Sequence, residues 1–316
     1  MSGGGGPVAA VDVGSNSVRL LVLDASGARL RREIVTTRLA EGVDATGRLD
    51  DAAIARTVAA LAGFRTLWEG LGVPTRPGRV RVVATSAVRD AIDRDRFLVP
   101  AAEALGIAVD VVTGTEEAAL GFAGAAGAVP VVPPVAVVDV GGGSTEIVIG
   151  DPDGADGRPV AAVSLQLGCV RLTERALGGD PPSEAEVAAA RTVVSEVVAA
   201  GLDRLRADGA DLRVGTLVAV AGTATTLAAL DLGLPAYEEA RIHGAVVPAD
   251  RLERLAARLV GMTAADRAGL GPVQPGRAEV LHGGALVLAG VVAALGVDRI
   301  VVSEADSLDA AAHGLR

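Results

Sequence analysis

Two segments of the chain repeat one pattern of apolar and polar positions. Val8–Asp24 reads VAAVDVGSNSVRLLVLD and Val135–Asp151 reads VAVVDVGGGSTEIVIGD, and they align without a gap at a separation of 127 residues. In each copy an apolar run ends in Asp-x-Gly, a small polar turn follows, and a second apolar run begins. Because Gly and Asn tolerate positive φ, such a turn can join two antiparallel strands. The pattern therefore predicts a duplicated β-hairpin with an acidic residue at the end of its first strand.

The rest of the chain alternates between helical and strand-like periodicity. In the first half the spacing predicts helices at Ala52–Leu71, Ser86 to about Asp93, Phe97–Leu105 and Glu116–Ala126, and strands at Val80–Ala84 and Val109–Val112. In the second half it predicts helices at Glu184–Arg206, Ala224–Leu230, Leu252–Leu259, Glu279–Leu295 and Ser307–Leu315, and strands at Leu217–Ala221 and Arg299–Ser303. Strands that alternate with helices indicate mixed sheets covered by helices.

A proline-rich segment, Ala128–Ala136 (AVPVVPPVA), separates the two halves. Together with the repeated hairpin it predicts an α/β fold of two actin-like (ribonuclease-H-like) domains, residues 1–130 and 131–316, with a cleft between them. We expect the last helix, at about residues 305–316, to pack back on the first domain.

Composition narrows the class of protein. Half of the residues are apolar but only 2 % are aromatic, so Val, Ala and Leu must fill the core. A net charge of −10 opposes a nucleic-acid-binding surface, whereas a cleft can still bind small anions through backbone N–H groups, arginines and a metal ion. The single cysteine, Cys169, excludes an intramolecular disulfide. With no secretory signal and no apolar run of about 20 residues, we expect a cytoplasmic, soluble protein without membrane partners.

The two hairpin turns are the first candidates for chemistry. Successive N–H groups in Asp12–Ser17 (DVGSNS) can form an anion-binding nest, although an ordinary hairpin turn explains this segment equally well. Asp139–Glu146 (DVGGGSTE) indicates a functional turn more strongly, because each glycine weakens a strand by up to about 1 kcal/mol relative to alanine. Three in a row indicate a ligand that approaches the backbone closely, and Glu146 adds a second carboxylate.

Three further segments each place polar residues where a strand meets a helix. In Ala84–Arg89 (ATSAVR), Ser86 can cap the helix, or the helix N-terminus and Arg89 can hold phosphate oxygens. In Thr113–Ala118 (TGTEEA), the two glutamates can oppose the helix dipole, or one of them can activate a water molecule. Ala221–Thr226 (AGTATT) can contact phosphate or a nucleoside, or can be a tight turn.

Other common sites are not indicated. The histidines at 243, 282 and 313 lack metal-ligand spacing, and we expect them to be structural or surface groups. The chain contains no lysine, which excludes a P-loop.

Taken together, DVGSNSVRL, ATSAVRDA, TGTEEA, DVGGGSTE and AGTATT resemble, in order and spacing, the exopolyphosphatase / guanosine pentaphosphate phosphatase family. The resemblance runs from Val8 to about Leu308 and fits the short form of that family, which has two actin-like domains. It implies a hydrolase that releases terminal orthophosphate from inorganic polyphosphate with Mg²⁺ (or Mn²⁺), with guanosine pentaphosphate as a second candidate substrate. It also implies a homodimer.

The resemblance implies roles for individual residues. Glu117 matches the catalytic base, Asp139 and Glu146 match carboxylates that hold Mg²⁺ or the water, and Arg89 matches an arginine that faces substrate phosphates. The phosphate-binding residues, including two from the AGTATT segment, are then Asp12, Gly14, Ser15, Asn16, Ser17, Arg19, Arg89, Gly141, Gly142, Gly143, Ser144, Thr145, Gly222 and Thr223. The chain departs from the family pattern at Glu279, where Asp is usual, and at Ala310, where Gly is common. Both departures lie outside the phosphate loops and bear on substrate choice more than on hydrolysis.

Two rival functions remain open. An actin-like ATP-dependent kinase, such as a sugar kinase, shares the twin Asp-x-Gly hairpins, but ATSAVR and TGTEEA argue against it. A sensor of guanosine tetra- or pentaphosphate with little turnover would bind the same ligands, but it would not need Glu117. Phosphate release without an acceptor separates the first rival from a hydrolase, and tight binding without release supports the second.

Overall fold

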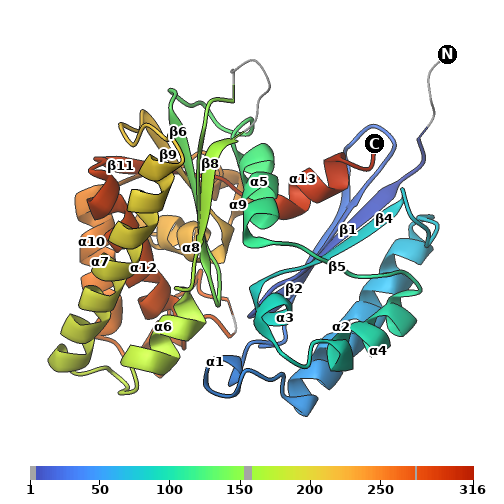
Figure 1. The fold of residues 1–316 in the computed structure, drawn as a ribbon, viewed down its shortest axis with the longest axis horizontal. Helices are drawn as coiled ribbons and strands as arrows, with labels where there is room; N and C mark the ends of the chain where they lie inside the picture. The colour runs from blue at the N-terminus through green and yellow to red at the C-terminus, as the bar shows by residue number, and fades with distance from the viewer. Residues whose placement is uncertain (1–4, 153–158, 275) are drawn as a thin grey trace. The chain divides into compact units, whose positions relative to one another are not determined.

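A computed structural model describes residues 5–152, 159–274 and 276–316 (Figure 1). The chain forms two compact units: unit 1 comprises Met1–Leu120 and Ser307–Arg316, and unit 2 comprises Gly121–Asp306. The chain thus leaves unit 1 ahead of the proline-rich segment that the sequence marks as the boundary. Each unit contains one mixed sheet with helices packed on it, which confirms the predicted α/β class.

The sheet of unit 1 is built around the first predicted hairpin. Its strands, in spatial order, are β3 (Arg29–Thr36), β2 (Ser17–Leu23), β1 (Val8–Val13), β4 (Val80–Ala84) and β5 (Asp110–Val111). β1 and β2 pair antiparallel, β3 continues this antiparallel ribbon, and β4 and β5 run parallel to β1. The carboxyl ends of β1, β4 and β5 therefore share one edge, from which the predicted loops leave.

Helices cover both faces of this sheet (Figure 1). The helices of unit 1 are α1 (Val43–Thr46), α2 (Asp51–Gly70), α3 (Ser86–Asp90), α4 (Asp95–Leu105), α13 (Ser307–His313) and the first part of α5 (Gly114–Ala125). Leu61, Phe64 and Trp68 of α2 are buried in the core that this helix shares with the sheet. Leu67 and Leu71 lie nearer the rim and are 37 % and 39 % exposed.

The C-terminal helix α13 closes the other face of the unit 1 sheet. Leu308, Ala311 and Ala312 are fully buried and form an apolar cluster with β1 and β2. Arg32 of β3 adds an ion pair with Asp309, with 3.2 Å between Nη1 and Oδ2. The last residues of the chain are thus part of the first half of the fold.

The sheet of unit 2 has the second hairpin near its centre. Its spatial order is β10 (Val246–Pro248), β11 (Arg299–Val302), β9 (Thr216–Val220), β6 (Val135–Val140), β7 (Thr145–Gly150) and β8 (Pro159–Leu165). β6, β9 and β11 run parallel, and the outer pairs are antiparallel. The helices are α6 (Cys169–Ala176), α7 (Glu184–Ala207), α8 (Ala221–Asp231), α9 (Glu239–Ile242), α10 (Ala249–Val260), α11 (Ala264–Ala268) and α12 (Leu281–Leu295).

Local signals explain where the long helices begin. Ser183 and Glu186 form a reciprocal capping box at the start of α7, which satisfies backbone donors that a helix otherwise leaves unpaired. The predicted strand at Leu217–Ala221 ends one residue early, because Ala221 already begins α8 with a φ of 60°. Among the described residues, no helix is long and apolar enough to cross a membrane.

Candidate active site

The turns of the two hairpins close in the same way. In unit 1 the Gly14 N–H donates to the Ser17 carbonyl at 3.1 Å, and in unit 2 the Gly141 N–H donates to the Ser144 carbonyl at 3.0 Å. A Cβ on Gly14 would lie 2.9 Å from the Ser17 oxygen, so the tight closure requires glycine there. The sequence repeat is therefore also a repeat of backbone geometry.

The carbonyl groups of the second loop are occupied by helix α6. The N–H groups of Cys169 and Val170 donate to the carbonyls of Gly141 and Gly142, each at 2.9 Å. The helix can approach this closely because its N-cap residue is Gly168, where any Cβ atom would overlap the Gly142 backbone. The first backbone N–H groups of α6 thus bind the carbonyl groups of the glycine loop.

The first loop is held in an analogous way by the segment that follows β3. The carbonyl of Asn16 accepts from the N–H groups of Thr37 and Arg38 at 3.0 and 2.9 Å, and the carbonyl of Ser15 accepts from Ala40 at 2.9 Å. Both loops therefore have their carbonyls engaged by neighbouring backbone.

The N–H groups of the same loops have no such partner. Within the described parts of the chain, the backbone N–H groups of Ser15, Asn16, Gly142 and Gly143 have no acceptor. Successive N–H donors in a tight turn, with the carbonyls turned away, form a concave site of partial positive charge that suits an anion. The geometry supports the interpretation of both turns as phosphate loops.

The acidic residues of the two hairpins have different surroundings. Asp12 and Arg19 are directly opposite each other on β1 and β2, and the guanidinium binds the carboxylate, with 3.0 Å between Nε and Oδ2. Asp139 and Glu146 are opposite each other on β6 and β7, and Glu146, which is 3 % exposed, accepts a hydrogen bond from Ser164 at 2.7 Å. Arg19 as a phosphate ligand thus stays a prediction, since its guanidinium is engaged by Asp12.

Arg89 and Glu117 form the second polar group of unit 1. Nη1 of Arg89, from α3, donates to Oε2 of Glu117, from α5, at 2.9 Å and to the Val112 carbonyl at 3.2 Å. Its buried Nη2 has no hydrogen-bond partner among the described residues. A buried guanidinium nitrogen without an acceptor is costly, and a phosphate oxygen would satisfy it.

The adjacent glutamates have different tasks. Oε2 of Glu116 accepts from both the N–H and the hydroxyl of Thr113 at 2.9 Å, and these bonds hold the pKa of its carboxyl below the usual value. Glu116 is therefore explained as a helix-start residue, whereas Glu117 faces Arg89. This separation supports the choice of Glu117 over its neighbour.

Ser86 is not the helix cap that the sequence allowed. The N-cap of α3 is Thr85, and Ser86 is the first helical residue. Its buried hydroxyl instead lies 2.8 Å from the hydroxyl of Ser15 in the first loop. The ATSAVR segment thereby contributes to the same loop region as DVGSNS.

The AGTATT segment lies beside the second loop. The Thr223 hydroxyl donates to the carbonyl of Val140, the last residue of β6, at 3.2 Å. Gly222 lies directly against the guanidinium of Arg277, which a Cβ at this glycine would overlap. Arg277 and Gly168 were not among the predicted site residues, although GRAEV places Arg277 just before the predicted helix at Glu279–Leu295.

Burial shapes the titration of three groups in unit 2. Burial raises the pKa of the Cys169 thiol to about 11. Burial, followed by the nearby Glu304 carboxylate, raises the pKa of Tyr237, whose hydroxyl donates to Glu304 at 2.5 Å. His282 is buried with neither ring nitrogen bonded among the described residues, and burial lowers its pKa to about 4. These groups are unsuited to proton transfer near neutral pH.

The described part of the chain was searched for clusters of metal-ligating side chains. Among the described residues, no group of three or more His, Cys, Asp or Glu side chains could hold an ion. Asp139 and Glu146 nevertheless fit Mg²⁺, which is commonly held by one or two carboxylates and completed by water and substrate phosphates.

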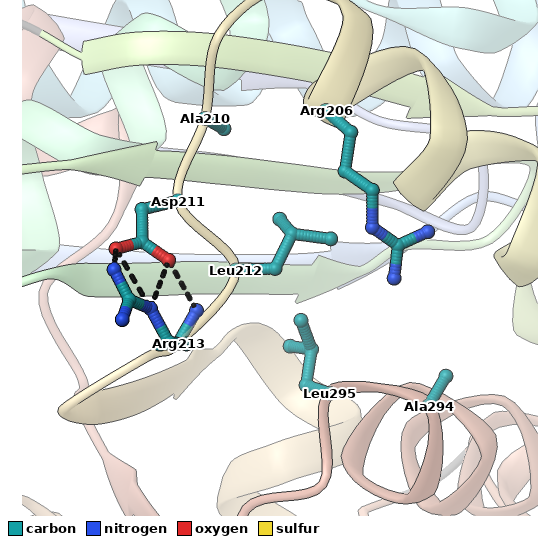
Figure 2. Close-up of a pocket in the computed structure, with 7 residues that line it drawn as sticks. All are labelled: Arg206, Ala210, Asp211, Leu212, Arg213, Ala294 and Leu295. Atoms are coloured by element: carbon teal, nitrogen blue, oxygen red, sulfur yellow. Dashed lines mark hydrogen bonds and ion pairs between the residues drawn. The ribbon is translucent and has the colours of Figure 1, made fainter.

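A separate pocket of about 430 Å³ lies near the C-terminal ends of α7 and α12 (Figure 2). Arg206, Arg213 and Leu295 are among its lining residues, and Arg213 donates to both carboxylate oxygens of Asp211. None of the predicted site residues lines it.

Comparison with known proteins agrees with these features. Residues 22–307 match the model of the Ppx/GppA phosphatase family. The chain is 44 % identical to Exopolyphosphatase 2 of Mycobacterium tuberculosis over 98 % of both chains, and 32 % identical to Exopolyphosphatase 1 of Mycobacterium leprae over 92 % of this chain and 84 % of that protein.

Solved structures show the same likeness. An exopolyphosphatase-like protein has a TM-score of 0.87 at 33 % identity, covering 96 % of this chain and 97 % of that one. The Aquifex aeolicus PPX-GPPA enzyme has a TM-score of 0.76 at 28 % identity, covering 96 % and 98 %. The chain belongs to the Ppx/GppA phosphatase family.

Proposed function

We propose that this protein is an exopolyphosphatase, a hydrolase that releases terminal orthophosphate from inorganic polyphosphate. The observation that carries the proposal is the pair of turns whose carbonyls are tied back while the N–H groups of Ser15, Asn16, Gly142 and Gly143 have no acceptor among the described residues. Each of these turns suits a phosphate group, because it presents N–H donors while its carbonyl groups are turned away. The names of the curated relatives support the same substrate.

The substrate phosphates would bind the loop amides and Nη2 of Arg89. Arg89 is well placed for this role because its Nη1 is fixed by Glu117 and by the Val112 carbonyl. A pre-fixed guanidinium loses little side-chain entropy when it binds a phosphate oxygen. Its charge would stabilise the negative charge that spreads over the transferred group.

Glu117 would act as the general base. A water oxygen attacks the terminal phosphorus, Glu117 accepts the water proton, and the anhydride P–O bond breaks so that the bridging oxygen leaves with the shortened chain. Glu117 forms an ion pair with Arg89, and substrate phosphate oxygens would compete for that guanidinium.

Asp139 and Glu146 would hold Mg²⁺, with Ser164 orienting the Glu146 carboxylate. The ion supplies positive charge to the phosphate oxygens when it is bound. A second activity on guanosine pentaphosphate and a homodimer stay predictions that follow from the family and, for the dimer, from the frequency of two-fold oligomers. A cytoplasmic location stays a prediction that follows from the sequence, which has a single cysteine and shows no secretory signal.

The test is orthophosphate release from long-chain polyphosphate, with Mg²⁺ and with a chelator, beside guanosine pentaphosphate and ATP. We expect metal-dependent release from polyphosphate without any acceptor. Release from ATP only when a sugar acceptor is added would favour the kinase. Tight binding of guanosine pentaphosphate with no release from any substrate would favour the sensor.

A further inference from the structure

Two buried hydroxyl groups meet where the first loop contacts helix α3. Ser15 belongs to the DVGSNS turn and Ser86 is the first residue of α3, and their Oγ atoms lie 2.8 Å apart although 71 residues separate them. The two residues are only 5 % and 3 % exposed. The contact joins the first loop to the short helix that also carries Arg89.

This pair of hydroxyl groups contains one hydrogen more than its own bond uses. A hydroxyl has one hydrogen to donate, so a single O–H···O bond leaves the hydrogen of the accepting hydroxyl available for a second bond. Among the described residues, neither of the two hydroxyls bonds any other group. Because a buried donor without an acceptor is costly, the remaining O–H suits an acceptor that a ligand supplies.

The neighbouring groups of unit 1 are donors as well. The N–H groups of Ser15 and Asn16 have no acceptor within the described parts of the chain, and the carbonyls of both residues already accept from the segment after β3. Arg89 follows Ser86 by three residues, a spacing that places two side chains on one side of a helix. Its buried Nη2 has no hydrogen-bond partner among the described residues. None of these groups can accept the hydroxyl hydrogen, whereas a phosphate oxygen can.

We propose that Ser86 is a positioning residue for the first loop. Its hydroxyl donates to Oγ of Ser15, and this bond directs the Ser15 O–H toward the phosphate group that the loop N–H groups bind. A hydroxyl that accepts one hydrogen bond is polarised and becomes a better donor in the next. Ser86 itself does not touch the phosphate. The inference rests on the proposed function only for the first loop as a phosphate site, and not for hydrolysis.

The test is a double-mutant cycle of Ser15→Ala and Ser86→Ala. The readout is kcat/KM for orthophosphate release from long-chain polyphosphate, and urea unfolding establishes that each variant is folded. We expect each single variant to lower kcat/KM by about tenfold, because a hydrogen bond to a charged group is weakened or lost. The double variant should be no worse than Ser15→Ala, since Ser86 acts only through the Ser15 hydroxyl.

The matched control is Thr57→Val in α2. The Thr57 hydroxyl is buried and donates to the Ala53 carbonyl at 2.7 Å, so this variant also removes a buried hydroxyl bond of unit 1. It should keep the kcat/KM of wild type whatever its effect on stability. If Ser86→Ala does not fold, Ser86→Cys provides a weaker donor of similar shape, and its loss should likewise vanish in the Ser15→Ala background.

The outcomes separate this inference from the proposed function. Unchanged kcat/KM in Ser86→Ala, or losses that multiply in the double variant, overturns the inference and leaves the exopolyphosphatase assignment standing. If wild type releases no orthophosphate, the proposed function is wrong, and the same cycle on the Kd of inorganic orthophosphate, measured by calorimetry, decides the inference by itself. A tenfold weaker Kd in each single variant, with no further loss in the double variant, then supports it. Additive effects or no phosphate binding by wild type overturns it.

Discussion

Gly168 is the N-cap of α6 and lies against the carbonyl side of the second loop. Its φ of −149° is ordinary extended backbone, so a substitution here tests space and not backbone strain. A Cβ would lie 2.6 Å from the Gly142 carbonyl carbon and 2.8 Å from the Gly141 oxygen, and closer still to the Gly142 oxygen. Contacts below 3.0 Å between a Cβ and backbone cannot persist, so either α6 or the loop must move.

Gly168→Ala should therefore affect stability moderately and catalysis strongly. Overpacking of this kind costs about 1–3 kcal/mol of unfolding free energy. Relieving the overlap requires a shift of several tenths of an ångström to about 1 Å, and a misplacement of about 1 Å in a catalytic group can cost on the order of 100-fold in rate. Urea unfolding would measure the first effect, and initial rates of orthophosphate release from polyphosphate the second.

The control is Gly63→Ala in α2. No atom lies within 4 Å of a Cβ at Gly63, and the residue is exposed in the middle of a helix. This variant should be more stable by about 0.5–1 kcal/mol and unchanged in rate. If Gly168→Ala has the unfolding free energy and rate of wild type, then α6 does not hold the loop as described.

Two buried groups give further predictions. The unfolded chain protonates His282 near pH 6.5, but burial lowers its folded pKa to about 4, so protonation favours unfolding between these values. The contribution of His282 to stability should fall by about 3 kcal/mol from pH 6.5 to 4, and His282→Leu should flatten the urea-measured pH profile in that window; an identical slope in both proteins would contradict this. The Cys169 thiol, with its pKa raised to about 11 and its side chain buried, should resist thiol reagents at pH 8 until the protein is unfolded, and rapid labelling of native protein would refute its burial.

Much of the fold could be predicted because local and repeated signals agree. The hairpins Val8–Asp24 and Val135–Asp151 combine apolar runs with turn residues, and the strand at Val80–Ala84 has the bounds that its apolar run predicts. The strand β3 was not predicted, because RLRREIVT is an edge strand with exposed or half-exposed residues throughout and has no apolar face. β8 and α6 were also missed; α6 is only 8 residues long, and half of them are polar.

The candidate site was predictable where one segment carries its own chemistry. The glycine turns and the two adjacent glutamates are visible as motifs. Contacts between distant segments cannot be predicted in this way, because no local sequence pattern indicates them. Arg277 lies against Gly222, and the amides of α6 hold Gly141 and Gly142, only because the folded chain brings these segments together. The hydroxyls of Ser15 and Ser86 likewise meet only in the folded chain.

The adjacent glutamates of α5 allow the most direct test of the central claim, that Glu117 activates water for attack on polyphosphate. Glu116→Gln is the matched control, because Glu116 bonds Thr113 at the helix start and faces no other predicted site residue among its described hydrogen bonds. With Mg²⁺ and saturating long-chain polyphosphate, Glu117→Gln should lower the rate of orthophosphate release by on the order of 100-fold or more while polyphosphate binding is retained, and Glu116→Gln should keep nearly the full rate. Full activity in Glu117→Gln, or an equal loss in both variants, would contradict the account.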